Sequence, residues 1–200
     1  MCSVFELLKQ DAAIPDQLAA MGVKFSGAVL EKRLVRRTDL APVVMADFAV
    51  TEMRWGFQRS GLGVVNNSRD DKLDSPMWRE SFSSRRCLIP MSGFYEWSGS
   101  AGRKQAHWFS HLENKCLWAA GIWERSVEHG CCFSMLTTSA NALMSPIHDR
   151  MPALLSDDAL VPYLAGDVRG FTVAEELLVV SECPSPLAKR KRDDGQGELF

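Results

Sequence analysis

The feature that most constrains this chain is a series of short apolar runs, each of strand length and bounded by polar turns. They lie at residues 42–45, 53–57, 87–90, 93–97, 108–109, 116–123, 131–137 and 177–180. Runs of this kind, rich in β-branched and aromatic residues, predict β-strands. Because they do not alternate regularly with helical segments, they argue against a doubly wound parallel sheet. The sequence therefore predicts a strand-rich α+β fold.

A few segments indicate helices instead. Ser3 and Glu6 form an S-x-x-E capping box followed by apolar residues, which predicts a helix at the N-terminus. Short helices are also expected at 17–21, 77–82 and 157–164. The polar segment 66–74 is expected to form a turn, and 98–103 a hairpin loop.

Composition limits the classes of protein to consider. A length of 200 residues suits one domain, and a formal net charge of −2 means that nucleic-acid contacts must come from a local patch. The sequence contains neither an apolar run long enough to span a membrane nor a secretory signal. Its six cysteines form no CxxC pair and its four histidines are scattered. We therefore expect reduced thiols, a reducing cytosol, and neither cofactor nor metal. We also expect a monomer.

The composition changes after residue 182, which predicts a domain over 1–182 and a solvated tail over 183–200. The tail carries the basic run 189–192 and ends with Gln196, Leu199 and Phe200 in a Q-x-x-L-F arrangement. This arrangement is similar to the motif with which bacterial replication proteins dock into the sliding clamp. Leu199 and Phe200 would then be apolar anchors and Gln196 a polar contact. The alternative is a disordered, solubilising tail.

Cys2 offers unusual chemistry. A cysteine at this position is small enough for the initiator methionine to be removed, which leaves an α-amine and a thiol on neighbouring carbons. An ordinary α-amine has a pKa of about 7.7–8.0, so a useful fraction is neutral near pH 7. The amine can form an imine with an aldehyde, and the adjacent thiol can close on the imine carbon to give a thiazolidine. A Met-Cys start can also be incidental.

Glu96 lies in the aromatic stretch Gly93-Phe94-Tyr95-Glu96-Trp97. In a strand, Phe94 and Glu96 face one side, and Tyr95 and Trp97 face the other. A carboxylate among aromatic residues should be partly desolvated, which suits proton transfer. The alternative is an ion pair with one of the arginines.

His148, Asn67 and Arg69 are further candidates. His148 is the natural general acid or base near neutral pH, or else a core histidine satisfied by Asp149. Asn67 and Arg69 supply an amide and a guanidinium to a cleft, or else simply form a turn.

Together these segments resemble the SRAP family, the SOS response-associated peptidases, which are understood as abasic-site sensors. The resemblance rests on Cys2 and the blocks Ala41-Pro42, Arg54-Trp55-Gly56, Asn67-Ser68-Arg69-Asp70-Asp71, Arg86-Cys87-Leu88-Ile89-Pro90, Gly93-Phe94-Tyr95-Glu96-Trp97, Ala120-Gly121-Ile122-Trp123-Glu124, Leu136-Thr137-Thr138-Ser139-Ala140-Asn141 and Ile147-His148-Asp149-Arg150-Met151-Pro152. These blocks span nearly the whole expected domain.

The resemblance implies a pseudo-barrel with a groove for single-stranded DNA and a role in the DNA damage response. Cys2 would form a thiazolidine with the abasic sugar, and Asn67 would hold the sugar or the amino terminus. Glu96 and His148 would move protons, and Glu96 would also remove the initiator methionine by self-processing. The implied DNA contacts are Trp55 and Trp97 for bases, Arg54, Arg69, Arg86 and Arg150 for phosphates, and Thr137 for phosphate or sugar.

Two positions depart from the family pattern. The family usually begins Met-Cys-Gly-Arg, whereas this chain has Ser3 and Val4, so one phosphate contact beside the nucleophile is missing. A proline and a second tryptophan usually follow the Trp-Gly pair, whereas this chain continues Phe57-Gln58-Arg59. Two other functions are weighed against abasic-site capture: a Cys/His thiol peptidase that acts on proteins, and a non-catalytic nucleic-acid-binding module.

Overall fold

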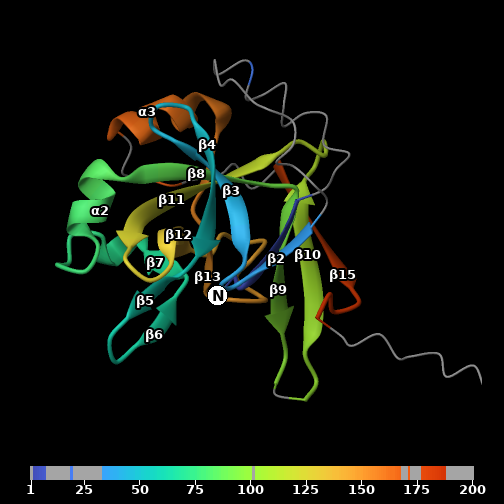
Figure 1. The fold of residues 1–200 in the computed structure, drawn as a ribbon. Helices are drawn as coiled ribbons and strands as arrows, with labels where there is room; N and C mark the ends of the chain where they lie inside the picture. The colour runs from blue at the N-terminus through green and yellow to red at the C-terminus, as the bar shows by residue number, and fades with distance from the viewer. Residues whose placement is uncertain are drawn as a thin grey trace, which may run out of the picture.

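A computed structural model describes residues 2–7, 19, 33–100, 102–167, 171 and 177–187. The fold is strand-rich with few helices, as predicted, and its main part is a small closed barrel (Figure 1). The barrel strands are β3 (Leu40–Met45), β4 (Val50–Trp55), β8 (Arg86–Met91), β11 (Leu117–Ser126) and β12 (Gly130–Ser139).

The barrel closes because β12 pairs on both sides. It pairs antiparallel with β11 and parallel with β4, and β4, β3, β8 and β11 complete the ring in that order. Further along β12, the short strand β7 (Asn67–Arg69) also pairs in parallel, with Met135 opposite Asn67. β13 (Arg150–Pro152) pairs with β12 and β14 (Leu154–Leu155) with β11.

A second sheet lies beside the barrel. Its strand order is β15 (Leu178–Cys183), β10 (Gln105–His111), β9 (Gly93–Ser98), β1 (Val4–Leu7) and β2 (Arg33–Arg36). The chain passes from the barrel strand β8 to β9 through the single residue Ser92, whose N–H donates to the Glu6 carbonyl at 2.9 Å. The start of the chain is therefore held next to the barrel.

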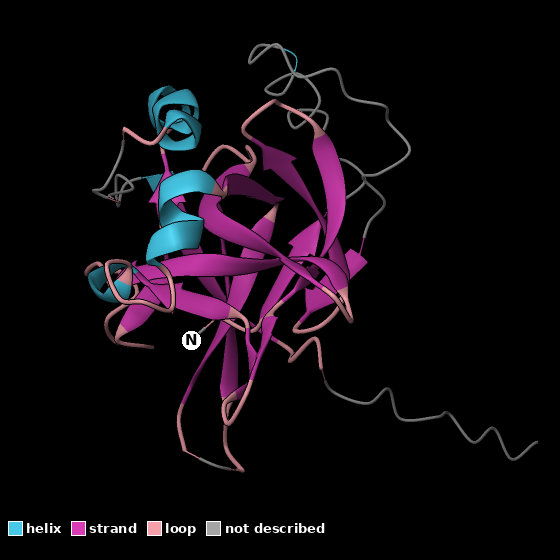
Figure 2. Cartoon of the chain, turned by 60° about the vertical axis from the view of Figure 1, so that its left-hand side comes forward, coloured by secondary structure: helices cyan, strands magenta, loops and turns pink. Residues whose placement is uncertain are grey.

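The remaining elements lie at the periphery, the helices on one side of the strands (Figure 2) and the hairpin of β5 and β6 at one end (Figure 1). They are the hairpin strands β5 (Phe57–Arg59) and β6 (Gly63–Val65), the helices α2 (Arg79–Ser84) and α3 (Leu160–Ala165), and the 3-10 turns η1 (Asp70–Lys72) and η2 (Asp157–Ala159). No helix in the described part of the chain is long and apolar enough to cross a membrane.

The core between barrel and second sheet is aromatic. The Trp55 ring stacks on Phe133 at 6.2 Å between centroids and meets Phe5 edge-on at 5.0 Å. All three side chains are fully buried, so β1 is fixed by packing as well as by strand pairing.

Most predicted strands are confirmed, and so are the short helices near 77–82 and 157–164. The predicted helix beginning at Ser3 is wrong, because residues 4–7 form β1 between β2 and β9. Part of the predicted turn at 66–74 is the strand β7. The predicted helix at 17–21, apart from residue 19, and the motif Gln196, Leu199 and Phe200 lie outside the described residues.

Gly93 is required where β9 begins. A Cβ atom at this position would lie 2.3 Å from the Trp108 ring and 2.4 Å from the Phe109 carbonyl oxygen. We expect Gly93→Ala to lower the free energy of unfolding by about 1–3 kcal/mol, because overpacking forces the ring or the strand to move. Urea denaturation measures this, with Ser100→Ala on the exposed loop as control; equal midpoints for both variants would contradict the expectation.

Candidate active site around Cys2

Cys2 lies two residues before β1, where the second sheet meets the barrel, and is only 1% exposed. Its carbonyl oxygen accepts a 2.7 Å hydrogen bond from Asn67 Nδ2 and a longer one, 3.4 Å, from Asn66 Nδ2. Its thiol lies 3.6 Å from the Val4 carbonyl oxygen. Because β7 is paired to the barrel strand β12, Asn67 ties the first residues of the chain to the barrel.

Glu96 is the buried carboxylate of this site. It lies on β9, between β1 and β10, and is 4% exposed. Phe94 is buried on the same face, whereas Tyr95 and Trp97 are half-buried on the other, as the alternation predicted. The Trp97 N–H donates to Glu96 Oε1 at 3.3 Å.

Burial, and secondarily the negative charge of Glu96, raise the pKa of the Cys2 thiol well above its ordinary range. The thiol therefore stays neutral near pH 7. Cysteines that act as thiolate nucleophiles lie in the opposite environment, which is electropositive and lowers the pKa. Cys2 is thus poorly suited to attack as a free thiolate in this state of the protein.

Asn67 has one unused polar atom. Its Nδ2 binds the Cys2 carbonyl, whereas its Oδ1 is buried and has no hydrogen-bond partner within the described residues. A buried acceptor without a donor is costly, so the site offers a place for an N–H or O–H group beside Cys2.

His148 lies just before β13, with its side chain 26% exposed. Its ring atom Nδ1 lies 3.0 Å from the Arg150 backbone nitrogen and 2.8 Å from Asp149 Oδ1. The Met144 carbonyl holds the His148 backbone N–H at 3.0 Å. The predicted pairing with Asp149 is therefore present, on a half-exposed rather than a core histidine.

The predicted DNA contacts divide by burial. Arg69 is half exposed and its guanidinium binds Asp71, while Arg54 is partly exposed and donates to the Gly56 carbonyl. Trp97 is half-buried beside Tyr95. These side chains retain exposed surface that a nucleic acid can reach.

The other four predicted contacts are buried and have structural partners. Trp55 is covered by Phe5 and Phe133 and donates through Nε1 to the Asn66 carbonyl, so neither ring face is open to a base. Arg86 donates to two backbone carbonyls and stacks on Phe82 and Tyr163. Thr137 is fully buried, and Arg150 is paired with Asp70. These residues support the fold as described.

The reasoning from sequence did not single out Asn66 or Asp70. Asn66 makes the second contact to the Cys2 carbonyl, and Asp70 binds both Arg150 and Thr138. Their position in the polar run 66–71, beside Asn67 and Arg69, is the only signal for them in the sequence. Two segments of the chain depart from the family pattern. In the first, Val4 is buried in β1, and in the second, Arg59 binds both carboxylate oxygens of Glu124.

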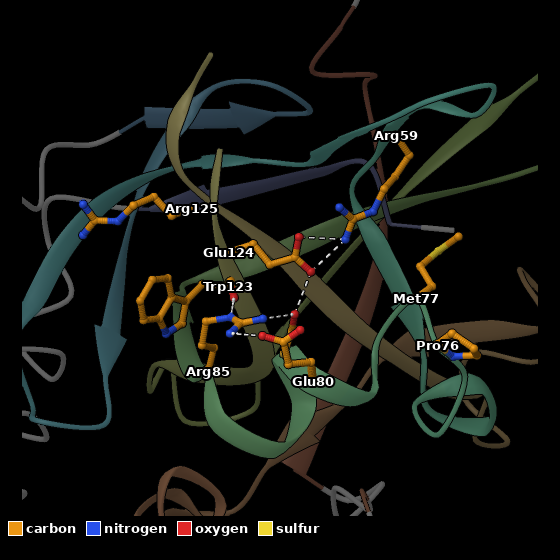
Figure 3. Close-up of a pocket in the computed structure, with 9 residues that line it drawn as sticks. Arg59, Pro76, Met77, Glu80, Arg85, Trp123, Glu124 and Arg125 are labelled. Atoms are coloured by element: carbon orange, nitrogen blue, oxygen red, sulfur yellow. Dashed lines mark hydrogen bonds and ion pairs between the residues drawn. The ribbon is translucent and has the colours of Figure 1, made fainter. Parts of the chain in front are cut away.

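A cavity of about 760 Å³ lies away from these residues, between β5, α2 and the end of β11 (Figure 3). Its polar groups are largely paired with one another. Glu124 accepts from Arg59 and Ser81, and Arg85 binds Ser81 and Glu80. None of the predicted catalytic residues lines it. The site around Cys2 is therefore defined by its contacts rather than by a large cavity.

Comparisons with known proteins agree with this arrangement. The family model "SOS response associated peptidase (SRAP)" matches residues 1–186. The abasic site processing protein YoaM of Bacillus subtilis is 27% identical over 154 residues, 62% of this chain and 67% of that protein. The abasic site processing protein YoqW of the same organism is 30% identical over 119 residues, 54% of this chain and 53% of that protein. The chain thus matches about half to two thirds of the length of these relatives.

The same fold occurs in crystal structures of other proteins. A crystal structure of a protein from Bacteroides thetaiotaomicron superposes with a TM-score of 0.76 at 19% identity, and the match covers 92% of each chain. At this identity the likeness concerns the fold alone. The family model covers both the Cys2 segment and the blocks around Glu96 and His148. The chain therefore belongs to the SRAP family, the SOS response-associated peptidases, and resembles abasic site processing proteins.

Proposed function

We propose that this protein captures abasic sites in single-stranded DNA by a covalent bond through Cys2, after removal of Met1, and so shields the lesion. The observation that carries the proposal is the tethering of Cys2. Asn67 holds its carbonyl at 2.7 Å, and the buried Glu96 lies close enough to affect its thiol. The α-amine and the thiol of one residue are thereby held beside a proton-transfer group.

The reaction needs no oxidant or reductant. Glu96 takes a proton from the α-ammonium of Cys2, and the free amine attacks the aldehyde carbon of the ring-opened sugar. Glu96 returns the proton to the leaving hydroxyl, so one water departs and a protonated imine remains, whose nitrogen keeps one hydrogen. The thiol sulfur then bonds to the carbon of this protonated imine, and the thiol proton passes to a nearby base, which leaves a neutral thiazolidine. His148 is the second proton carrier, for ring closure and its reversal.

Three further roles are proposed. Arg54 and Arg69 would contact phosphates and Trp97 a base, since these side chains remain at least partly exposed. The unused Asn67 Oδ1 would accept a hydrogen bond from the freed α-amine or from a sugar hydroxyl. Glu96 would also assist self-removal of Met1.

The raised pKa of the Cys2 thiol favours this function over a thiol peptidase. A peptidase needs a thiolate, which burial and Glu96 oppose. Imine chemistry needs a neutral amine and tolerates a neutral thiol.

The test is a denaturing gel of protein lacking Met1, incubated with single-stranded DNA that carries one abasic site. We expect a slow-migrating covalent species that is absent with intact DNA. Acetylation of the mature α-amine should abolish it, because an amide nitrogen does not form an imine. A species that survives acetylation would instead support attack by the thiol alone, and no species with unmodified protein would overturn the proposal.

A further inference from the structure

Arg150 is an unusually well-anchored residue next to His148. Its guanidinium is buried, and the whole residue is 7% exposed. Nη2 donates to Asp70 Oδ1 at 2.7 Å and also to the carbonyl of Thr137 on β12. The second oxygen of Asp70 accepts from Thr138 at 2.7 Å. Asp70 therefore links Arg150, at the start of β13, to Thr138 on the barrel strand β12. Its bond to Arg150 is charge-assisted, and such bonds are stronger than neutral hydrogen bonds.

This anchoring fixes a backbone donor. The Arg150 N–H donates to His148 Nδ1 at 3.0 Å. A ring nitrogen that accepts a hydrogen bond carries no proton, so a neutral His148 that accepts this bond bears its proton on Nε2. Because the Arg150 side chain is fixed, its backbone N–H keeps pointing at His148 Nδ1, whereas a donor on a surface side chain could rotate away.

Asp149 competes for the same atom. Its Oδ1 lies 2.8 Å from His148 Nδ1, and its side chain is 84% exposed. A carboxylate only accepts, so it binds Nδ1 only when that nitrogen is protonated, whereas the Arg150 N–H binds it only when it is not. The Asp149 contact thus fits an imidazole protonated on Nδ1, charged or neutral, whereas the Arg150 contact fits only the neutral tautomer with its proton on Nε2.

We propose that Asp70 and Arg150 are positioning residues for His148, which hold the neutral imidazole in the tautomer with its proton on Nε2. This inference rests on the proposed function for its catalytic meaning, because a defined tautomer presents one fixed donor to the reacting atoms. Asp149 takes over Nδ1 when the ring is protonated. Asp70 acts through Arg150, and its side-chain hydrogen bonds within the described residues go to Asp71, Thr138 and Arg150 rather than to Cys2.

The test reads the tautomer directly in the free protein. Nitrogen–carbon correlation NMR of labelled imidazoles, at about pH 9 and thus above an ordinary histidine pKa of about 6.5, separates the two tautomers. The His148→Gln variant assigns the signal among the four histidines. We expect Nε2–H for His148 in the wild type, and a mixture of tautomers in Asp70→Asn, which keeps the shape but weakens the anchor.

Controls separate positioning from general damage. Asp70→Glu should restore the wild-type tautomer, and Glu52→Gln, which removes a more exposed partner of Arg33, should leave it unchanged. Asp70→Asn should slow covalent capture about tenfold or more, because small misplacements of a proton carrier are costly. A neutral wild-type His148 protonated on Nδ1 would overturn the inference, as would an unchanged tautomer in Asp70→Asn. Neither reading depends on whether the protein captures DNA.

Discussion

Replacing Cys2 with alanine should reduce covalent capture of abasic DNA at least about a hundredfold, to below detection on a denaturing gel. Alanine is small enough for Met1 still to be removed, so the α-amine remains and an imine can form. Without the thiol no ring closes, and the imine hydrolyses when the protein is denatured. The fold should survive, because the substitution removes only one sulfur atom from the buried core.

A reductant distinguishes imine formation by the α-amine from ring closure by the thiol. Adding borohydride before denaturation should trap the imine of Cys2→Ala as a stable amine, and so recover a shifted band. Cys183→Ala, which removes a half-buried thiol on β15, should behave as the wild type in both assays. A durable adduct of Cys2→Ala without reductant would refute the thiazolidine.

Replacing Glu96 with glutamine should slow capture by about 10²–10⁴-fold, the usual contribution of a general acid or base. Glutamine keeps the size of the side chain and an oxygen that can accept from the Trp97 N–H, so the structural loss is small. Single-turnover gel kinetics with abasic DNA measure the rate.

Although Glu96→Gln slows capture, it should make the Cys2 thiol more reactive. The charge of Glu96 raises the pKa of the Cys2 thiol, so its removal lowers that pKa and increases the thiolate fraction at a given pH. Alkylation of Cys2 by iodoacetamide should therefore be faster in Glu96→Gln, although burial, the larger cause, still keeps the pKa high. Slower alkylation together with slower capture would indicate a general loss of structure. Unchanged capture would remove Glu96 from the mechanism.

The strands were predictable from sequence where local pattern and tertiary pairing agree. The stretch around Glu96 is an example, because its alternation matches the buried and half-exposed faces of β9. At the N-terminus the two disagree. Ser3 and Glu6 have the spacing of a capping box, but pairing with β2 and β9 determines the structure of Val4–Leu7. Barrel closure through β12 joins distant segments and has no local signal.

The sequence indicated several residues that lie together in the structure, and their roles stay predictions. Cys2, Asn67 and Glu96 are brought together as expected. Trp55, Arg86, Thr137 and Arg150 stand in the same family blocks, yet all four are buried with protein partners. A motif identifies positions where the residue type matters, either because the side chain supports the fold from inside or because it binds a ligand at the surface. Burial and hydrogen-bond partners, which the structure gives, distinguish these two roles.

The pairing of β1 with β9 also limits the period during translation in which Met1 is accessible to other enzymes. Cys2 cannot be enclosed until β9, which ends at Ser98, has left the ribosome. At about 5–20 residues per second, synthesis to that point takes roughly 5–20 s, during which the nascent N-terminus is open to the cell's methionine-removing enzymes. Afterwards the same residue is packed against the barrel. Enzymatic removal of Met1 is thus favoured early in translation, whereas the self-removal proposed for Glu96 can act only after β9 has paired with β1. Codons that slow the segment before β9 should increase the fraction of chains processed before folding.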